Sequence, residues 1–445
     1  MPSRVAMTGS ICDGVMEATG AMSHTKASVI VVGGGPAGLA AALSAGRAGA
    51  DVLVAAPPHQ APGARQDTRT AALFGGSIEL LKNVGAWDAI APESAPIVGI
   101  RIVDDTGALL RAPELLFTAS EVGRDAFGWN VPNSALVGGL LRAAAARDSR
   151  VGLIETAGIA EVAVNPSAAY LTTREGAAFE AALVIGADGR NSISRQAAGI
   201  GVRTWTYEQS AIVTSFQHSR PHGSISTELH RPAGPLTTVP LPGNRSSLVW
   251  VERPPEAQRL AALDNQAFTS ELERRLQGLL GTVSDLTPRA MFPLSGLTAT
   301  SFGQNRVALV GEAGHVIPPI GAQGLNLGLR DAATLADCVA DALAAGRDPG
   351  GTETLEAYSS RRRLDVLSRS STVDVLNRSL ISGVLPVHLA RGFGLFALHA
   401  LGPLRRLAIR EGLGPTTGEV PHLLKPDGAR LLAERASASR PERAA

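Results

Sequence analysis

Residues 29–38 read VIVVGGGPAG, and this stretch decides the fold of the first part of the chain. Val29–Val32 is a short apolar run of the kind that forms a strand buried on both faces. Glycines follow, then the alanine-rich residues 37–48, which predict a helix, and a second strand at residues 51–55. A strand, a glycine turn, a helix and a further strand together predict a dinucleotide-binding lobe.

Three glycines, Gly33, Gly35 and Gly38, fit the GxGxxG spacing between that strand and that helix. The first permits a tight turn, the second lets backbone approach a pyrophosphate, and the third lets the helix pack on the strand. The amino end of the helix adds free N–H groups and a positive dipole. We therefore assign Gly33, Gly35, Ala37 and Gly38 to pyrophosphate binding. An acidic residue that binds ribose normally ends the second strand, but Ala56 stands there.

The composition is that of a compact protein, with 44% hydrophobic and 18% charged residues in 445. A chain of this length can form two or three lobes around a large core. The net charge of +1 gives no electrostatic argument for nucleic acid as a partner. The two cysteines, Cys12 and Cys338, lack metal-ligand spacing. We therefore predict no metal site and expect a reducing, cytoplasmic location.

The sequence pattern divides the chain into successive segments of an α/β protein. We expect a disordered extension at 1–27, a nucleotide-binding lobe at 28–206 with a hairpin near 96–112 that joins the next lobe, an inserted lobe of antiparallel strands at 207–300, a return to the first lobe at 301–350, a helical region at 351–420 and a disordered tail at 421–445.

Two later segments place polar residues directly after apolar, strand-like runs. They are GADGRNSISR at residues 186–195 and VGEAGHVIPPIGAQGLN at residues 310–326. Taken alone, the first is an ordinary Asp-Gly turn with a helix cap at Ser192. In the second, His315 could be catalytic, but a structural histidine bonded to neighbouring backbone is the favoured interpretation.

Taken together, the three segments, in this order and spacing, resemble the class A flavin-dependent aromatic hydroxylases. Further stretches resemble the ubiquinone-biosynthesis hydroxylases within that class: DTRTAAL at 67–73, GPLTTVPL at 234–241 with SLVW at 247–250, and QGLNLGLRD at 323–331. The similarity spans about residues 29–343. It implies a discontinuous Rossmann-like FAD-binding lobe, an inserted antiparallel β-rich substrate lobe and a C-terminal helical region.

The resemblance also implies which residues contact the cofactor. They are Gly33, Gly35, Ala37, Gly38, Arg69, Asn133, Asp188, Arg195, Gly311, Glu312, Gly324, Leu325 and Asn326, with Asp188 and Arg195 also implicated in NAD(P)H contacts. The catalytic candidates are Pro319, as a rigid wall beside the flavin, and the helix start at Gly324, Leu325 and Asn326, whose N–H groups would stabilise negative charge on reduced flavin. Glu312 is one methylene longer than the family's usual aspartate.

By the same resemblance, NAD(P)H reduces FAD, dioxygen forms a flavin C4a-hydroperoxide, and the ring of a polyprenylated phenol or quinol is hydroxylated in ubiquinone biosynthesis. One rival is a class A hydroxylase that acts on a soluble aromatic metabolite. Another is a non-catalytic subunit of a quinone-biosynthesis assembly, for which the changes at Ala56, Glu312 and Gly314 leave room.

An apolar stretch at Leu380–Leu404 is interrupted by Pro386, His388 and Arg391, so it does not predict a transmembrane span. The favoured interpretation is a helix packed on the FAD lobe. The alternative is an interfacial helix that brings the protein to the inner face of the membrane, where a prenylated substrate dissolves.

Overall fold

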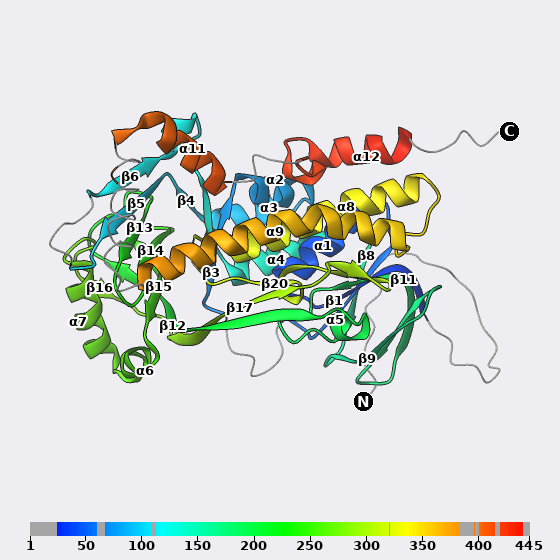
Figure 1. The fold of residues 1–445 in the computed structure, drawn as a ribbon, viewed down its shortest axis with the longest axis horizontal. Coiled ribbons are helices and arrows are strands. Elements are labelled where there is room, and N and C mark those ends of the chain that lie inside the picture. The colour runs from blue at the N-terminus through cyan, green and yellow to red at the C-terminus, as the bar shows by residue number, and fades with distance from the viewer. Residues whose placement is uncertain are drawn as a thin grey trace.

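The computed structural model describes residues 25–59, 67–107, 113–319, 321–381, 396, 400–413 and 419–438. Figure 1 shows two lobes side by side, with the long helix α9 (Thr352–Ile381) lying across the front of both. The predicted α/β architecture, with a Rossmann-like lobe and an antiparallel lobe, is confirmed.

The first lobe is built on a largely parallel sheet of the order β18-β19-β11-β1-β2-β8, with β10 paired to β11 and β9 paired to β10. Its strands are β1 (Thr25–Val32), β2 (Val52–Ala56), β8 (Val151–Glu155), β9 (Ile159–Val164), β10 (Ala169–Thr173), β11 (Ala178–Gly186), β18 (Gly303–Gln304) and β19 (Val307–Leu309). Val29, Ile30 and Val31 are fully buried because helices and strands cover both faces of β1. Helices α1 (Pro36–Arg47) and α8 (Gln323–Ala344) pack on one face, so the sheet draws its parts from both ends of the chain.

The second lobe is a mainly antiparallel sheet of the order β20-β17-β12-β15-β14-β13-β5-β6. Its strands are β5 (Gly99–Asp104), β6 (Leu115–Thr118), β12 (Val202–His218), β13 (Ile225–His230), β14 (Leu236–Leu241), β15 (Arg245–Glu252), β16 (Val283–Ser284), β17 (Ala290–Ala299) and β20 (His315–Val316). Strand β12 is long enough, about 50 Å, to run from one lobe into the other (Figure 1). Helices α6 (Pro254–Ala262) and α7 (Asn265–Leu276) cover the outer face, where Trp250 and Phe216 are buried.

In the region of the predicted hairpin, β5 pairs antiparallel with β6. Residues 108–112, between these strands, lie outside the described part. A small third sheet lies between the lobes and contacts β14. It contains β3 (Thr70–Phe74), β7 (Gly128–Pro132) and β4 (Ala95–Ile97), followed or flanked by α2 (Gly75–Asn83), α3 (Trp87–Ile90), η1 (Ala91–Glu93), η2 (Ala119–Val122) and α4 (Asn133–Ala144).

The end of the chain differs from the expected disordered tail. Within the predicted tail, η4 (His422–Leu424) and α12 (Gly428–Ala438) fold onto the first lobe. Helix α11 (Gly402–Leu413), which lies in the predicted helical region, packs on the second lobe. Leu423 and Leu432 are fully buried in the main core, and Asn83 Nδ2 donates to the carbonyls of Leu423 and Lys425. The prediction of disorder is wrong for η4 and α12, because Leu423 and Leu432 anchor this polar stretch in the core.

Two other expectations fall largely outside the described residues. Of the N-terminal extension, only Thr25 onward is described, and it already belongs to β1. Of the apolar stretch at Leu380–Leu404, most residues are outside. Within the part that the structure describes, no helix combines the length and apolar character needed to cross a bilayer.

Candidate active site

The glycine turn after β1 is closed by backbone-to-backbone contacts. Gly33 has φ +116°, and a Cβ there would lie 2.3 Å from the carbonyl oxygen of Ala187. A Cβ on Gly38 would lie 2.0 Å from the carbonyl oxygen of Gly33. At Gly35, which caps α1, a Cβ would meet nothing within 4 Å. The turn therefore has no room for a side chain at Gly33 or Gly38, but it is open at Gly35, at the amino end of α1. A pyrophosphate-binding turn requires this combination.

The segments at residues 29–38 and 310–326 meet near the amino ends of α1 and α8. Gly311 begins η3 (Gly311–Ala313) with φ +63°, and a Cβ there would lie 3.1 Å from Cβ of Ala37 in α1. A Cβ on Gly328 in α8 would lie 3.2 Å from Cα of Gly311. Small residues thus let α1 and α8 approach each other closely at Gly311 of η3. This arrangement fits one elongated nucleotide cofactor that contacts the amino ends of both α1 and α8.

The first turn of α8 is fixed by the side chain of Asn326, which is 3% exposed. Its Nδ2 donates to the carbonyls of Ala72 (2.8 Å) and Ala322 (2.7 Å). Its Oδ1 accepts from the N–H of Phe74 (3.0 Å) and the hydroxyl of Ser77 (2.7 Å). This side chain is fully used within the protein, so Asn326 positions the helix. The N–H groups of the first turn, including those of Gly324 and Leu325, have no acceptor within the helix.

The loop before α8 carries the predicted proline wall. Pro318 is buried and Pro319 is exposed, while Ile320 lies outside the described residues. Gly321 and Ala322 both have positive φ, 68° and 53°, and Ala322 caps α8. A left-handed alanine is costly and persists only where its surroundings impose it, so this turn is held by its context, including the Asn326 bond to Ala322.

Arg69 and Asn133 meet at Asp67. Arg69 donates through Nε and Nη2 to both carboxylate oxygens of Asp67, at 2.8 and 2.7 Å, and Asn133 Nδ2 donates to the same carboxylate at 3.0 Å. Partial burial opposes ionisation, but the hydrogen bonds from Arg69 and Asn133 lower the pKa of Asp67 to about 2. The Arg69 guanidinium lies 5.8 Å from the ring centre of Phe292. Its hydrogen bond to Asp67, with the charges of Asp67 and Glu312, raises the pKa of Arg69.

Asp188 and Arg195 have different surroundings. Oδ2 of Asp188 accepts from the N–H and hydroxyl of Ser194, both at 3.0 Å, whereas its Oδ1 is buried without a partner in the described residues. That unsatisfied oxygen fits a hydroxyl group of a bound cofactor. The guanidinium of Arg195 donates to the carbonyls of Ala313 (2.8 Å) and Arg190 (2.9 Å). Arg195 therefore ties the segment at residues 186–195 to η3. Both of these bonds are internal to the protein and give no support for a direct nicotinamide contact through its side chain.

A buried ionic network, which the sequence did not reveal, lies behind η3. Asp331 is fully buried and accepts from the N–H of Gly311 (2.9 Å), from His315 Nε2 (2.7 Å) and from Arg362 Nε (2.6 Å). Burial alone would raise its pKa, but the charges and hydrogen bonds of these partners lower the pKa of Asp331 to about 2. Arg362 also donates to Asp365 at 2.7 Å. The partner of His315 is therefore a buried carboxylate, and not the neighbouring backbone that the favoured interpretation expected.

The inner face of the second lobe forms an apolar wall toward the first lobe. Register places Val213 opposite Val249, Val249 opposite Thr237, and Ala211 opposite Phe292, so these side chains share one face. Val213, Thr237 and Val249 are half-buried, and Phe292 is 41% exposed. Phe292 also lies beside Arg69, which connects this wall to the cofactor side.

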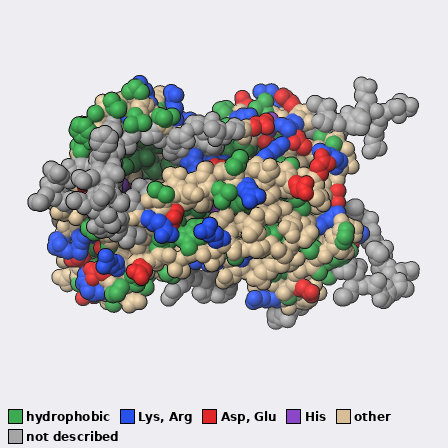
Figure 2. All heavy atoms as spheres, viewed as in Figure 1, with side chains coloured by type: hydrophobic (Ala, Val, Ile, Leu, Met, Phe, Trp, Pro, Cys, Tyr) green, Lys and Arg blue, Asp and Glu red, His purple; other side chains and the backbone are tan. Residues whose placement is uncertain are grey.

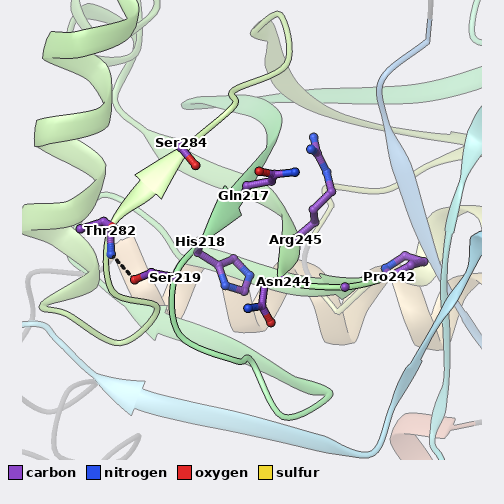
Figure 3. A pocket seen from close by; sticks show the side chains of 9 residues that line it. Gln217, His218, Ser219, Pro242, Asn244, Arg245, Thr282 and Ser284 are labelled. Atoms are coloured by element: carbon purple, nitrogen blue, oxygen red, sulfur yellow. Dashed lines mark hydrogen bonds between the residues drawn. The ribbon is translucent and has the colours of Figure 1, made fainter.

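A depression of about 410 Å³ lies at the carboxyl end of β12 (Figure 3). His218 contacts the carbonyl of Arg220 (2.8 Å) and the hydroxyl of Ser246 (3.0 Å), and burial lowers its pKa. Thr282 N–H donates to Ser219, the dashed line in Figure 3. The lining of this depression is largely polar, and no group of three or more metal-ligating side chains occurs among the described residues. It gives no sign of chemistry.

Comparison with known proteins agrees with this geometry. Residues 26–368 match the family described as FAD binding domain. The chain is 37% identical to ubiquinone hydroxylase UbiL of Rhodospirillum rubrum over 390 residues, 87% of this chain and 90% of that one. It is 32% identical to 3-demethoxyubiquinol 3-hydroxylase of Escherichia coli over 397 residues, 88% of this chain and all of that one.

Among solved structures, p-nitrophenol 4-monooxygenase PnpA of Pseudomonas putida DLL-E4 superposes with a TM-score of 0.72 at 20% identity, covering 89% of this chain and all of that one. At that identity the likeness concerns the fold. The family match and the relatives above 30% identity show the rest: the chain belongs to the FAD-dependent monooxygenases, within the family of the ubiquinone-biosynthesis hydroxylases.

Proposed function

We propose that this protein hydroxylates the aromatic ring of a polyprenylated phenol or quinol in ubiquinone biosynthesis, with NAD(P)H as reductant and dioxygen as oxidant. The observation that carries the proposal is the convergence of α1, η3 and α8 on Gly311, in a protein whose second lobe has an apolar wall that meets Arg69 at Phe292. The printed functions of the two relatives, a ubiquinone hydroxylase and a demethoxyubiquinol hydroxylase, support the substrate class.

The residues would divide the work as follows. The turn at Gly33–Gly38 and the amino end of α1 would hold the pyrophosphate of FAD, and Asp188 Oδ1 would accept from one of its hydroxyls. The free N–H groups at the start of α8 would face the negative charge of the reduced ring. When bound, FAD supplies hydride acceptance from a nicotinamide and activation of dioxygen. The half-buried wall would orient the substrate ring and exclude water.

A contact with the membrane surface is supported by α11. Ile409 is buried with Leu115 and Phe117, and Arg405 donates to Glu121, which fixes one edge of the helix to the second lobe. The remaining surface exposes Leu401, Leu404 and Leu407 together with Arg406 and Arg410. Figure 2 shows hydrophobic and basic side chains gathered at the upper left, where α11 lies in Figure 1. Leucines flanked by arginines suit an anionic lipid surface, where a prenylated substrate dissolves.

Cosedimentation with lipid vesicles tests this contact. Wild-type protein should bind phosphatidylcholine vesicles that contain phosphatidylglycerol, and the double variant Leu404→Asp/Leu407→Asp should bind them at least about tenfold less. Leu364→Asp is the matched control, because Leu364 on α9 is 78% exposed and lies outside α11. Equal loss in both variants, or equal binding by the wild type and the double variant, would contradict a role for α11.

Turnover of the purified protein tests the reaction itself. Its flavin absorption should bleach under anaerobic NADPH, faster with a prenylated phenol present, and aerobic turnover should add one oxygen to the ring, as mass spectrometry would show. A flavin that no nicotinamide reduces would favour the non-catalytic subunit. Preferred hydroxylation of a carboxylated, water-soluble phenol would favour the soluble-metabolite hydroxylase.

A further inference from the structure

Three polar side chains meet where the small third sheet contacts the substrate lobe. The hydroxyl of Thr70 (β3) donates to Ser247 (β15) at 2.9 Å, and Asn130 Nδ2 (β7) donates to the same hydroxyl at 3.0 Å. Ser247 can pass its own hydrogen to the carbonyl of Val239, at 3.5 Å. Thr70 and Ser247 therefore have their partners within this cluster, and only Asn130 remains to be accounted for.

The orientation of the Asn130 amide is fixed by a carbonyl. Asn130 Nδ2 lies 2.9 Å from the carbonyl oxygen of Pro240, and a carbonyl can only accept, so the atom facing it must be the nitrogen. The other atom of the amide, Oδ1, is buried and has no partner in the described residues, and the whole residue is 1% exposed. A buried acceptor without a donor is destabilising, so this oxygen has an unused capacity to accept one hydrogen bond.

Strand register places Asn130 next to the cofactor side of the site. Asn130 lies opposite Ala72 in the β3–β7 pair, about 5 Å away. The carbonyl of Ala72 accepts from Asn326, which fixes the start of α8. Asn130 is therefore separated by one strand from the helix end assigned to the reduced flavin ring.

The same amide also borders the apolar wall. Ser247, its partner on β15, lies two residues from Val249 and opposite Ser215 in the register that sets Val249 opposite Val213. Ser247 and Val249 thus lie on one face of β15. Asn130 therefore lies between the half-buried apolar surface and the strand that holds the start of α8.

We propose that Oδ1 of Asn130 accepts a hydrogen bond from the ring hydroxyl of the substrate and thereby selects a phenol and fixes its rotation in the site. The inference rests on the proposed function, and it names the polar group that the site recognises. A phenolic O–H is a donor, which is what an isolated buried acceptor lacks. A site built to bond a hydroxyl rejects the analogue without it, because the acceptor is then left unpaired.

A binding cycle with paired ligands tests the contact. The holoenzyme is titrated with 2-prenylphenol and with prenylbenzene, which differs only by the hydroxyl, and the change in flavin absorption gives each Kd. In the wild type, loss of the hydroxyl should weaken binding about tenfold or more; in Asn130→Leu, the two ligands should bind within about twofold of each other. Equal binding of both ligands by the wild type would overturn the proposal without any variant.

Thr70→Val is the matched control, because it breaks the cluster at Ser247 and leaves the Asn130 amide in place. It should keep the preference for the phenol. Loss of that preference in Thr70→Val, or its retention in an Asn130→Leu protein that still holds FAD, would show that Asn130 only joins the two sheets. If either result is found while NADPH still reduces the flavin and 2-prenylphenol is still hydroxylated, this inference is wrong. The proposed function is then unaffected.

Discussion

The glycine cradle around Gly33 and the apolar wall around Val249 border one site, but they are held in opposite ways. In the cradle, backbone meets backbone so closely that a single added carbon would overlap its neighbour, at 2.0 Å for Gly38. In the wall, half-buried side chains from β12, β14 and β15 leave surface uncovered. A part that must fit one cofactor is fixed by backbone, whereas a part that adapts to a substrate is built from side chains.

The largest expected effect lies behind the cradle, at Arg362. Arg362→Leu should lower the free energy of unfolding by about 3–5 kcal/mol, because it leaves the buried carboxylate of Asp331 without its cationic partner. It should also weaken FAD binding, since Asp331 holds the N–H of Gly311. Denaturant unfolding and FAD titration measure both. The control is Arg378→Leu on the same helix, whose ion pair with Asp374 is largely exposed on the arginine side and should change stability by less than about 1 kcal/mol.

The acid stability of the protein should report the same network. The pKa of Asp331 is lowered to about 2, below its unfolded value, so its stabilising contribution is complete above about pH 4 and is lost as the pH falls toward 2. Without Arg362 the pKa of Asp331 rises toward its unfolded value, so this contribution shrinks, and the less stable variant should unfold at a higher pH than the wild type. An unchanged acid-unfolding midpoint in Arg362→Leu would contradict the assigned pairing.

The next effect compares two glycines within the cradle. Gly38→Ala should destabilise the apoprotein by about 1–3 kcal/mol, because the turn must shift to admit the methyl group. Gly35→Ala should leave apoprotein stability within about 0.5 kcal/mol, because its φ of −73° suits alanine and the space is open, but it should weaken FAD binding. Thermal unfolding without FAD and flavin fluorescence quenching separate the two. Equal FAD affinity for Gly35→Ala and wild type would place the pyrophosphate elsewhere.

The cradle was predictable from sequence because its information is local. Gly33, Gly35 and Gly38 follow one strand and begin one helix, so spacing alone indicated their roles. What closes the cradle is not local: the atom that excludes a side chain at Gly33 belongs to Ala187, and the contact of Ala37 is with Gly311. The order of the motifs suggested that these parts meet, but only the fold shows which atoms touch.

The ionic network and the tail were hidden for a different reason. Arg362 and Asp365 belong to a helix with many charges, and such a pattern normally marks a solvated face. Arg362 is buried because α8 brings Asp331 against it, and the half-buried Asp365 pairs with Arg330 of the same helix α8. Both are contacts between separate helices. A possible signal was Arg330-Asp331 inside an otherwise apolar helix. Likewise, the polar composition of residues 428–438 concealed Leu432, which is fully buried in the core.

The smallest expected effect is on the wall, at Val249. Val249→Ala should lower the free energy of unfolding by about 1 kcal/mol or less, because the side chain is only half-buried, and FAD affinity should not change. It should alter KM for a prenylated phenol a few-fold. Leu248→Ala is the matched control one residue away, because Leu248 is 1% exposed and faces α6 and α7. This variant should lower the free energy of unfolding by about 2–5 kcal/mol. The KM of its folded fraction should not change. Chemical unfolding and steady-state kinetics of the two variants therefore test the face assignment directly. If Val249→Ala were as destabilising as Leu248→Ala, or released FAD, the wall would be ordinary core and the contrast with the cradle would fail.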